Sequence, residues 1–572
     1  MAGVVLFTLF LFTITQYALA AETNCSRIFH SAVVSNGKIY IDGGEMHTRW
    51  PNDTITTKPI DDLETIDLTK SWVNSDSDLY TYIPKPLANH TAIYLDEGAA
   101  WSDGENLFFY GGYVSGVDGP SVPPLGTWKY NIVSNEWTHS GFSGAALVRL
   151  CQGGAVQSSN KAYYLGGSLN PGGNPSFAGT EGADVYMDPG LITLDMDTLQ
   201  WTNASTADMN EWGTIGDGYT SLLESAGDEG VIVAFGGYKY PVGQTLSYLA
   251  YRQNETIHRN SMEMVRVYDI AEQKWYTQQT SGDIPGWRMS GCTVVAPAQD
   301  LSSYSIYVFG GMANTTAQSD GNVYVLSVPS FRWIRATDDN SIRIKHKCVR
   351  PQNNTMIVVG GNTPVTDREY DPLPQNCDSA TFANGIASST STLSRGCLTI
   401  MQVTAMRIRS LLRCLTSLVG GIETGGATVV SPESGFNSTS MEDLFKKRNN
   451  VADSGTSSTS TPSTTGQSSG ASKSLSGGGI AGVVVGCVAG VGLIAGLAWF
   501  LTLRHRKAKA ASSSRLAWQS DASAIPPLDQ SPRKELYGSG PEVYEMGTRD
   551  QPRFEMPAEN ILAEMPAEGI KR

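Results

Sequence analysis

Short runs of β-branched and aromatic residues that end in a Gly-Gly pair recur six times between residues 25 and 361. Each run is preceded by a second short strand signal, such as 30–34 or 291–295. These runs predict β-strands, and glycine supplies the backbone freedom and close packing needed where a strand leaves a crowded sheet. The glycine pairs are Gly43 with Gly44, Gly111 with Gly112, Gly166 with Gly167, Gly236 with Gly237, Gly310 with Gly311, and Gly360 with Gly361.

A tryptophan follows five of the six glycine pairs, on a later predicted strand. Successive pairs are 50 to 74 residues apart, which is typical of a repeat that forms one supersecondary unit with insertions. One unit cannot cover its own apolar faces, so we expect the units to pack on one another with the tryptophans between them. The tryptophans are Trp72, Trp137, Trp201, Trp275 and Trp333.

This pattern resembles the Kelch repeat, in which each unit forms one four-stranded blade of a β-propeller. The resemblance implies an all-β fold, a six-bladed Kelch-type β-propeller over residues 25–414. The sixth repeat departs from the pattern, because residues 387–414 show neither strand alternation nor Kelch spacing. We interpret this stretch as a reading-frame or intron error, which sequencing the transcript tests. If the stretch is genuine, we expect the last two strands of blade six to be missing or replaced and the ring to be poorly closed.

Two apolar segments lie outside the repeats. Residues 1–20 have a short apolar core that ends in small residues, which is typical of a cleaved signal peptide, with an uncleaved signal anchor as the alternative. Residues 480–503 carry no charge, are long enough for a transmembrane helix, and are followed at once by basic residues. The predicted topology is type I, in the plasma membrane or a secretory-pathway membrane, with the propeller outside and a cytoplasmic tail at 504–572.

The segments that flank the predicted transmembrane helix are expected to be disordered. Residues 415–479 form a stalk, and its Ser/Thr-rich part at 451–479 has too little apolar surface to fold. Ser531, Tyr537 and Tyr544 in the tail indicate docking of a cytoplasmic partner, with an unstructured tail that has no specific partner as the alternative. The whole layout resembles the membrane-anchored Kelch-repeat proteins of filamentous fungi, within the galactose-oxidase-like Kelch superfamily.

Charge and cysteine usage fit an extracellular domain. The formal net charge is −14, and an acidic ectodomain repels nucleic acid, so we expect no such partner. Seven of the eight cysteines precede residue 480, where disulfides are permitted, and Cys25 with Cys377 is one of several pairings that the spacing leaves open. Sequons for N-glycosylation lie at Asn24, Asn52, Asn89, Asn203, Asn254, Asn314, Asn353 and Asn437.

Because the superfamily includes copper radical oxidases, the resemblance raises the question of catalysis. A copper site needs His and Tyr ligands that converge, but no two histidines fall close together, and His30, His90 and His346 occupy similar places in different repeats. No nucleophile elbow, HExxH or P-loop motif is present. We therefore expect no catalytic residue, no metal, no cofactor and no enzymatic activity. The alternative is a propeller enzyme, an oxidase or hydrolase acting on carbohydrate at the cell surface.

The insertions after the Gly-Gly pairs are the predicted ligand face. Equivalent loops of successive blades emerge on one face of the ring, and these loops, at 45–64, 113–126, 168–190 and 238–260, are rich in aromatic residues. We expect this face to bind an extracellular protein or glycan without catalysis; the alternative is that the aromatic residues pack the loops together. The residues are Trp50, Tyr113, Phe177, Tyr186, Tyr238, Tyr240, Tyr248 and Tyr251.

Overall fold

The computed structural model of the chain describes residues 23–447 with internal gaps. The chain divides into two compact parts, Met1–Ser457 and Ser458–Arg572, and every described residue belongs to the first. The undescribed positions within 23–447 are 73, 75, 89–90, 93–94, 115–121, 171, 175–184, 243–244, 247–255, 314–319, 337–341, 352–354, 364–405, 408–419 and 421–424.

The described residues form a mostly all-β, propeller-type fold of antiparallel sheets. Each of the first five repeats folds into four strands that pair in chain order, and we call these groups repeat units 1 to 5. Unit 1 contains β2 (Ser31–Ser35), β3 (Lys38–Asp42), β6 (Asp62–Asp67) and β7 (Thr81–Pro84). Unit 2 contains β10 (Asp96–Ser102), β11 (Asn106–Tyr113), β12 (Thr127–Asn131) and β13 (Glu136–Ser140).

Units 3 and 5 each gain a short outer strand that runs parallel to their fourth strand. Unit 3 contains β15 (Gly154–Gln157), β16 (Lys161–Leu165), β19 (Leu191–Asp195) and β20 (Gln200–Ala204), with β14 (Ser143–Gly144) outside. Unit 4 contains β21 (Tyr219–Leu223), β22 (Val231–Phe235), β24 (Met264–Asp269) and β25 (Lys274–Gln279). Unit 5 contains β27 (Cys292–Pro297), β28 (Tyr304–Phe309), β29 (Val323–Val328) and β30 (Arg332–Arg335), with β26 (Ser281–Gly282) outside.

Unit 6 is built differently. Its strands β31 (Ile344–Val349) and β32 (Thr355–Asn362) pair with each other, and β33 (Met406–Arg407) pairs with β32 in the third position. The N-terminal strand β1 (Thr23–Ile28) also reaches β32, where Arg27 is opposite Gly361. The expectation of a poorly closed ring is therefore wrong, because β1 joins the first repeat to the last and β33 comes from the irregular segment itself.

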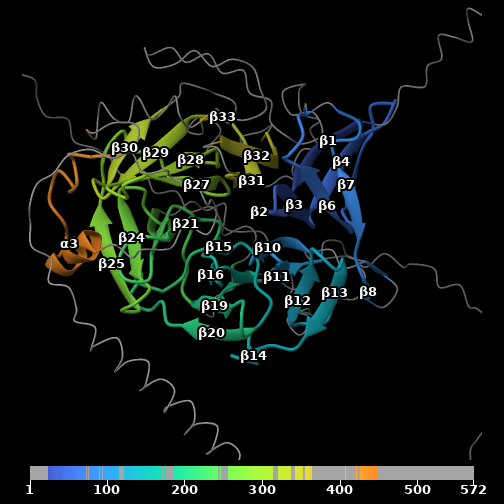
Figure 1. Ribbon diagram of the computed structural model, residues 1–572, viewed down its shortest axis with the longest axis horizontal. Coiled ribbons are helices and arrows are strands. Elements are labelled where there is room, and N and C mark those ends of the chain that lie inside the picture. The colour runs from blue at the N-terminus through green and yellow to red at the C-terminus, as the bar shows by residue number, and fades with distance from the viewer. Residues whose placement is uncertain are drawn as a thin grey trace, which may run out of the picture. The chain divides into compact units, whose positions relative to one another are not determined.

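The innermost strands form a closed cycle at the centre of the described part of the chain. Strands β2, β10, β15, β21, β27 and β31 each contact the next one, and β31 contacts β2. Figure 1 shows the sheets following one another around this centre. Neighbouring units share hydrophobic clusters, and the side chains of Trp201, Trp275 and Trp333 are buried between their own unit and the preceding one. Trp72 and Trp137 are half-buried at the two remaining junctions that hold a repeat tryptophan.

Each glycine pair lies against the segment that leads into the innermost strand of the next unit. All twelve glycines have a positive φ. A Cβ atom on Gly111 would lie 2.2 Å from the Leu150 carbonyl oxygen, and one on Gly43 would lie 2.1 Å from that of Leu95. The backbone nitrogen of Gly112 donates to the same Leu150 carbonyl at 2.7 Å. Glycine is thus required twice, for the left-handed backbone and for the approach of two chains.

The insertions contain strands of their own. The hairpin β4 (Glu45–Arg49) and β5 (Ile55–Pro59) pairs with β1. Strand β18 (Val185–Met187), from the insertion of unit 3, pairs with β17 (Ser168–Leu169) and with β23 (Thr245–Leu246) from the insertion of unit 4. Neighbouring insertions therefore support one another. The remaining short elements are β8 (Leu87–Ala88), β9 (Thr91–Ala92) and the 3-10 turn η3 (Thr256–His258).

The predicted stalk is wrong over 425–447, because this stretch packs on units 4 and 5. Helix α3 (Thr439–Lys446) begins after Ser438, whose hydroxyl accepts a hydrogen bond from the Met441 nitrogen, and it buries Met441, Leu444 and Phe445 in the cluster between those units. The Gln278 side chain also bonds to the backbone on either side of Phe436. We call residues 425–447 the strap; its sequence has the apolar residues that the later Ser/Thr-rich stretch lacks.

Other predicted segments lie outside the described residues. These are the signal peptide at 1–20, the Ser/Thr-rich stretch at 451–479, the apolar segment at 480–503 and the tail at 504–572. Within the described ranges, no helix is long and apolar enough to cross a membrane.

Candidate functional site

One residue of each unit occupies the same place, at or just before the start of the innermost strand. These six residues have a left-handed backbone with φ between 50° and 63°, although none is glycine. A left-handed residue with a Cβ costs roughly 1–2 kcal/mol, so the surrounding structure must hold it in place. We call them the mouth residues; they are Phe29, Glu97, Gln152, Asp217, Ser290 and Lys345.

Backbone hydrogen bonds connect successive mouth residues. The nitrogen of Asp217 donates to the Gln152 carbonyl at 2.8 Å, that of Ser290 to Asp217 at 2.9 Å, and that of Lys345 to Ser290 at 2.8 Å. On the other side of the ring, the nitrogen of Glu97 donates to the Phe29 carbonyl at 2.6 Å. These hydrogen bonds link the backbones of neighbouring units at one end of the central channel, where the mouth side chains lie.

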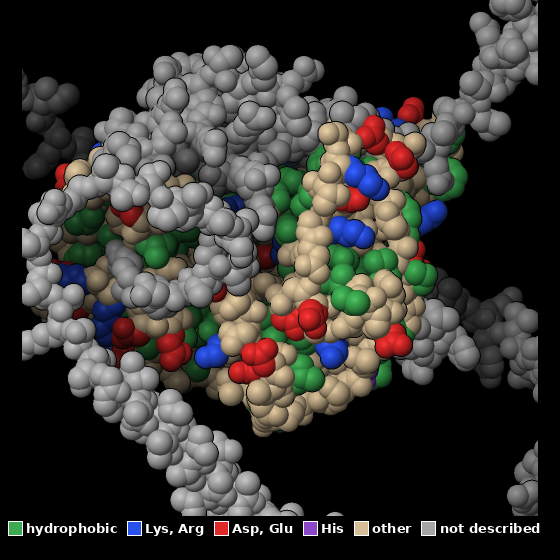
Figure 2. Space-filling view, in the orientation of Figure 1, with side chains coloured by type: hydrophobic (Ala, Val, Ile, Leu, Met, Phe, Trp, Pro, Cys, Tyr) green, Lys and Arg blue, Asp and Glu red, His purple; other side chains and the backbone are tan. Residues whose placement is uncertain are grey.

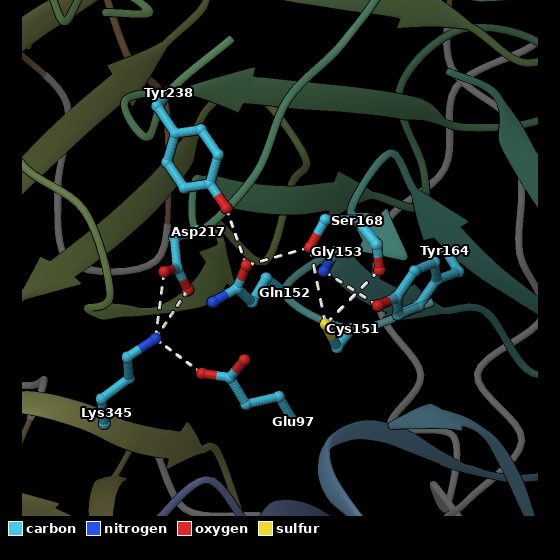
Figure 3. Close-up of polar contacts among 9 residues, drawn as sticks. All are labelled: Glu97, Cys151, Gln152, Gly153, Tyr164, Ser168, Asp217, Tyr238 and Lys345. Carbon is cyan, nitrogen blue, oxygen red and sulfur yellow. Dashed lines mark hydrogen bonds and ion pairs between the residues drawn. The ribbon is translucent and has the colours of Figure 1, made fainter. Parts of the chain in front are cut away.

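Lys345 joins two carboxylates across this end of the channel. Its Nζ lies 2.6 Å from Glu97 Oε1 and 3.0 Å from Asp217 Oδ2 (Figure 3). All three side chains are nearly buried. Burial opposes the charged form of Lys345, yet Asp217 and Glu97 hold the pKa of Lys345 above its ordinary value. Burial also raises the pKa of Glu97, against the attraction of Lys345.

Gln152 connects the mouth to two insertions. Its Oε1 accepts hydrogen bonds from the Tyr238 hydroxyl at 2.7 Å and from the Ser168 hydroxyl at 3.0 Å (Figure 3). Ser168 and Tyr238 are the first residues after their glycine pairs, so the polar mouth and the insertions lie on the same face of the ring. The neighbouring Cys151 thiol is buried beside Ser168, and burial raises the pKa of Cys151, which keeps it protonated.

A cavity of about 50 Å³ opens between the mouth residues. All six mouth residues line this cavity, and so does Lys347, two residues beyond Lys345 on β31. None of the aromatic residues of the insertions lines it. Among the described residues, the Lys347 side chain makes no hydrogen bond or ion pair, and burial lowers the pKa of Lys347. The mouth thus holds two acids and two lysines in a small space, and the Lys347 ammonium can donate a hydrogen bond to a ligand.

The two histidines next to mouth residues are buried where their unit meets the preceding one. His30 Nε2 lies 3.1 Å from the Val359 carbonyl, and His346 Nε2 lies 3.2 Å from the Phe309 carbonyl. Burial, with nearby cations, lowers the pKa of His346 to about 3 and that of His30 well below its ordinary value. Both histidines are therefore neutral packing residues at neutral pH, and His90 lies outside the described residues.

The structure separates the predicted ligand-face aromatic residues. Tyr238 and Tyr240 are buried in a cluster with Met187, Met289 and Met312, so their assignment to an exposed ligand face is wrong and the packing alternative holds for them. Trp50 is exposed on the β4–β5 hairpin, and Tyr113 and Tyr186 are half-buried. Phe177, Tyr248 and Tyr251 lie outside the described residues.

Cysteines and sequons are also placed. A disulfide joins Cys292 on β27 to Cys348 on β31, a pairing that the sequence did not indicate. Cys25 is disulfide-bonded, while the predicted partner Cys377 lies outside the described residues. The described sequon asparagines, Asn24, Asn52, Asn203 and Asn437, are all exposed; Asn89, Asn254, Asn314 and Asn353 lie outside the described residues.

Sequence reasoning missed the mouth residues because they share no side-chain type. One signal was present: in four units the mouth residue precedes a glycine, as in Glu97-Gly98 and Asp217-Gly218, shortly before a strand. The corresponding glycines of units 3 and 5 leave room for a tyrosine, since a Cβ on Gly153 would lie 2.2 Å from the Tyr164 ring.

The repeats, the antiparallel sheets and one curated relative together support a Kelch-repeat protein. A Kelch repeat-containing protein of Arthroderma benhamiae is 30% identical over 371 residues, covering 59% of this chain and 53% of that protein. The chain thus spans about half the length of this curated relative. No family model matches the chain. The match to the solved structure of YjhT spans 61% of this chain and 95% of the YjhT chain, at 14% identity. Its TM-score of 0.38 is too low to carry an argument.

Proposed function

We propose that the chain is a type I cell-surface protein whose units are the six blades of a Kelch-type propeller. The face of the ring that carries the mouth and the insertions, which we call the insertion face, binds an extracellular protein without catalysis. The relative supports the propeller as a protein-interaction module. The leader-like residues 1–20, the apolar segment at 480–503 and the exposed sequons support the topology. Glycans remain the second class of extracellular ligand.

The size of the mouth cavity favours a protein over a glycan. Pockets that enclose small molecules span roughly 300–1,000 Å³. The mouth cavity has about 50 Å³ and holds a few waters or one small polar group, not a sugar ring. In this proposal, the partner lies across the insertion face and places a single polar group near Lys347. The small size of the cavity is the observation that carries the proposal.

The surface charge fits a partner recognised by shape and a few fixed contacts. Figure 2 shows acidic and basic side chains interspersed over the described part of the face that it draws. A highly charged polymer needs a surface of one sign instead. The Lys58 ammonium lies 5.5 Å from the centroid of the Trp50 indole. Trp50 adds an exposed aromatic anchor on the β4–β5 hairpin.

The test measures ligand capture by the full chain in detergent, against extracellular proteins and cell-wall glycans separately. We expect a protein ligand, tenfold or more weaker binding by Lys347→Gln, and no change for Lys274→Gln on an outer strand, since a lost charge-assisted contact costs about 1.5–3 kcal/mol. Glycan binding alone reassigns the ligand class. Release of sugar products or hydrogen peroxide, or binding that ignores both Lys347→Gln and Trp50→Ala, contradicts the proposal.

A further inference from the structure

The disulfide between Cys292 and Cys348 crosses the junction of units 5 and 6. It connects two innermost strands, β27 and β31, whose cysteines are 56 residues apart in sequence and 5.4 Å apart at Cα. Cys292 is buried and Cys348 is half-buried. The bond therefore ties the irregular last unit to its neighbour at the inner edge of the ring.

His346 completes a group of three donor atoms with these sulfurs. One ring nitrogen of His346 and the two Sγ atoms all lie within 4.8 Å of one another. The carbonyl oxygen of Phe309 is 3.2 Å from His346 Nε2 and 3.9 Å from Cys292 Sγ, so it lies beside both side chains. Two thiolates and an imidazole are the donors of soft metal sites.

The hydrogen bond to Phe309 leaves one nitrogen of His346 available. A neutral imidazole has one N–H and one lone pair, and donation from Nε2 to a carbonyl places the lone pair on Nδ1. His346 Nδ1 is buried and makes no hydrogen bond. Metal-binding histidines commonly donate their other nitrogen to a backbone carbonyl in this way, which fixes the orientation of the ring.

Glycines hold this imidazole in place. A Cβ on Gly310 would lie 2.5 Å from His346 Cε1, and one on Gly361 would lie 2.6 Å from His346 Cβ. The ring is thus confined between two glycine pairs. A donor that is already oriented loses little freedom when it binds an ion.

We propose that Cys292, His346 and Cys348 form a redox-gated site for a soft metal ion, Zn²⁺ or Cu⁺. A reductant, a dithiol or a phosphine, supplies two electrons, the S–S bond breaks, and each sulfur takes up a proton. Ion binding then releases these two protons and forms two metal–thiolate bonds and one metal–imidazole bond. The junction of units 5 and 6 is joined covalently when oxidised and by the metal when reduced.

His30 provides a natural comparison within the chain. It occupies the equivalent position of the next unit, and its Nε2 also faces a backbone carbonyl, that of Val359. Its Nδ1 is likewise buried without a hydrogen bond. Within the described ranges, only His346 belongs to a candidate metal-binding group, so the cysteine pair is what distinguishes the two sites.

The test uses the full chain in detergent and Co²⁺ as a spectroscopic stand-in for Zn²⁺. The protein is reduced with a phosphine, freed of reductant without oxygen, and titrated with Co²⁺. We expect one Co²⁺ with a thiolate-to-cobalt charge-transfer band that Zn²⁺ removes. His346→Gln should bind at least about tenfold more weakly, and His30→Gln should bind as the parent does. Cys292→Ser with Cys348→Ser corrects for the other cysteines.

Three outcomes would overturn the proposal. The first is a reduced parent that binds no more Co²⁺ than the double serine variant. The second is equal weakening by His346→Gln and His30→Gln, which would indicate a general effect on packing. The third is loss of the β-sheet circular dichroism on reduction, because a site that needs the folded junction cannot then form.

Discussion

Lys345 Nζ lies 2.6 Å from Glu97 Oε1, although the two residues are 248 positions apart in the chain. The same ammonium reaches Asp217, so one side chain of unit 6 contacts units 2 and 4 across the channel. Unit 6 is the unit that lacks the regular strand pattern. The cross-channel ion pairs therefore add to β1 and the Cys292–Cys348 disulfide as connections between this unit and the rest of the ring.

Replacing Lys345 with methionine should destabilise the protein strongly. The substitution leaves Glu97 and Asp217 nearly buried without a counter-charge, and breaking a buried ion pair from one side costs about 3–5 kcal/mol. Thermal unfolding should show a clear fall in melting temperature. As a control, Lys446→Met removes a lysine whose side chain is 62% exposed, so the melting temperature should barely change.

The combined variant Glu97→Gln, Lys345→Met and Asp217→Asn separates charge from packing. It removes all three buried charges, so it should recover much of the stability lost by Lys345→Met. If the triple variant is as unstable as the single one, the ion pairs are not the cause of the loss.

These ion pairs show where reading the sequence reaches its limit. The glycines and tryptophans of the repeats were predictable, because each acts through local chemistry that recurs in every unit. The mouth residues act through pairings that only the closed ring creates, and their side chains differ from unit to unit. Similarly, nothing near Tyr238 in sequence shows that its hydroxyl bonds to Gln152, 86 positions away.

Gly111→Ala should be far more damaging than Gly104→Ala. Both glycines have a positive φ, so each variant pays the backbone strain of about 1–2 kcal/mol. Only at Gly111 would the new Cβ meet the Leu150 carbonyl, at 2.2 Å, whereas Gly104 has nothing within 4 Å. Urea unfolding of the two variants measures the difference. Equal losses would show that the glycine pairs serve backbone conformation alone.

Stability should fall in mild acid through His30. Burial, followed by the charge of Arg27, lowers the pKa of His30 well below its ordinary value of 6.5. Below that pH the unfolded chain binds a proton that the folded protein does not, so the free energy of unfolding decreases as pH falls. The contribution is up to about 1.4 kcal/mol per pH unit.

His30→Gln isolates this effect. Glutamine does not titrate, and its amide can still donate to the Val359 carbonyl. Urea unfolding between pH 7 and pH 5 should therefore show a shallower loss for the variant than for the parent. An unchanged slope would place the acid sensitivity elsewhere, with His346 as the next group to replace.

The strap defines where the folded domain ends. Phe445 is buried, with its ring 5.4 Å from that of Phe331 and 6.1 Å from that of Phe436. Phe445→Ala should cost about 3–5 kcal/mol, because it opens a cavity between the helix and units 4 and 5. Its neighbour Lys446 is exposed, so Lys446→Ala is the matched control and should leave stability nearly unchanged.

Limited proteolysis distinguishes a packed strap from the stalk predicted for this stretch. If α3 is part of the domain, the parent should resist cleavage within 425–447, and Phe445→Ala should become sensitive there as the helix detaches. Cleavage of the parent within 425–447 at the same rate as in the Ser/Thr-rich stretch would contradict the packing. The segment would then act as a stalk after all, and its apolar residues would need a different partner.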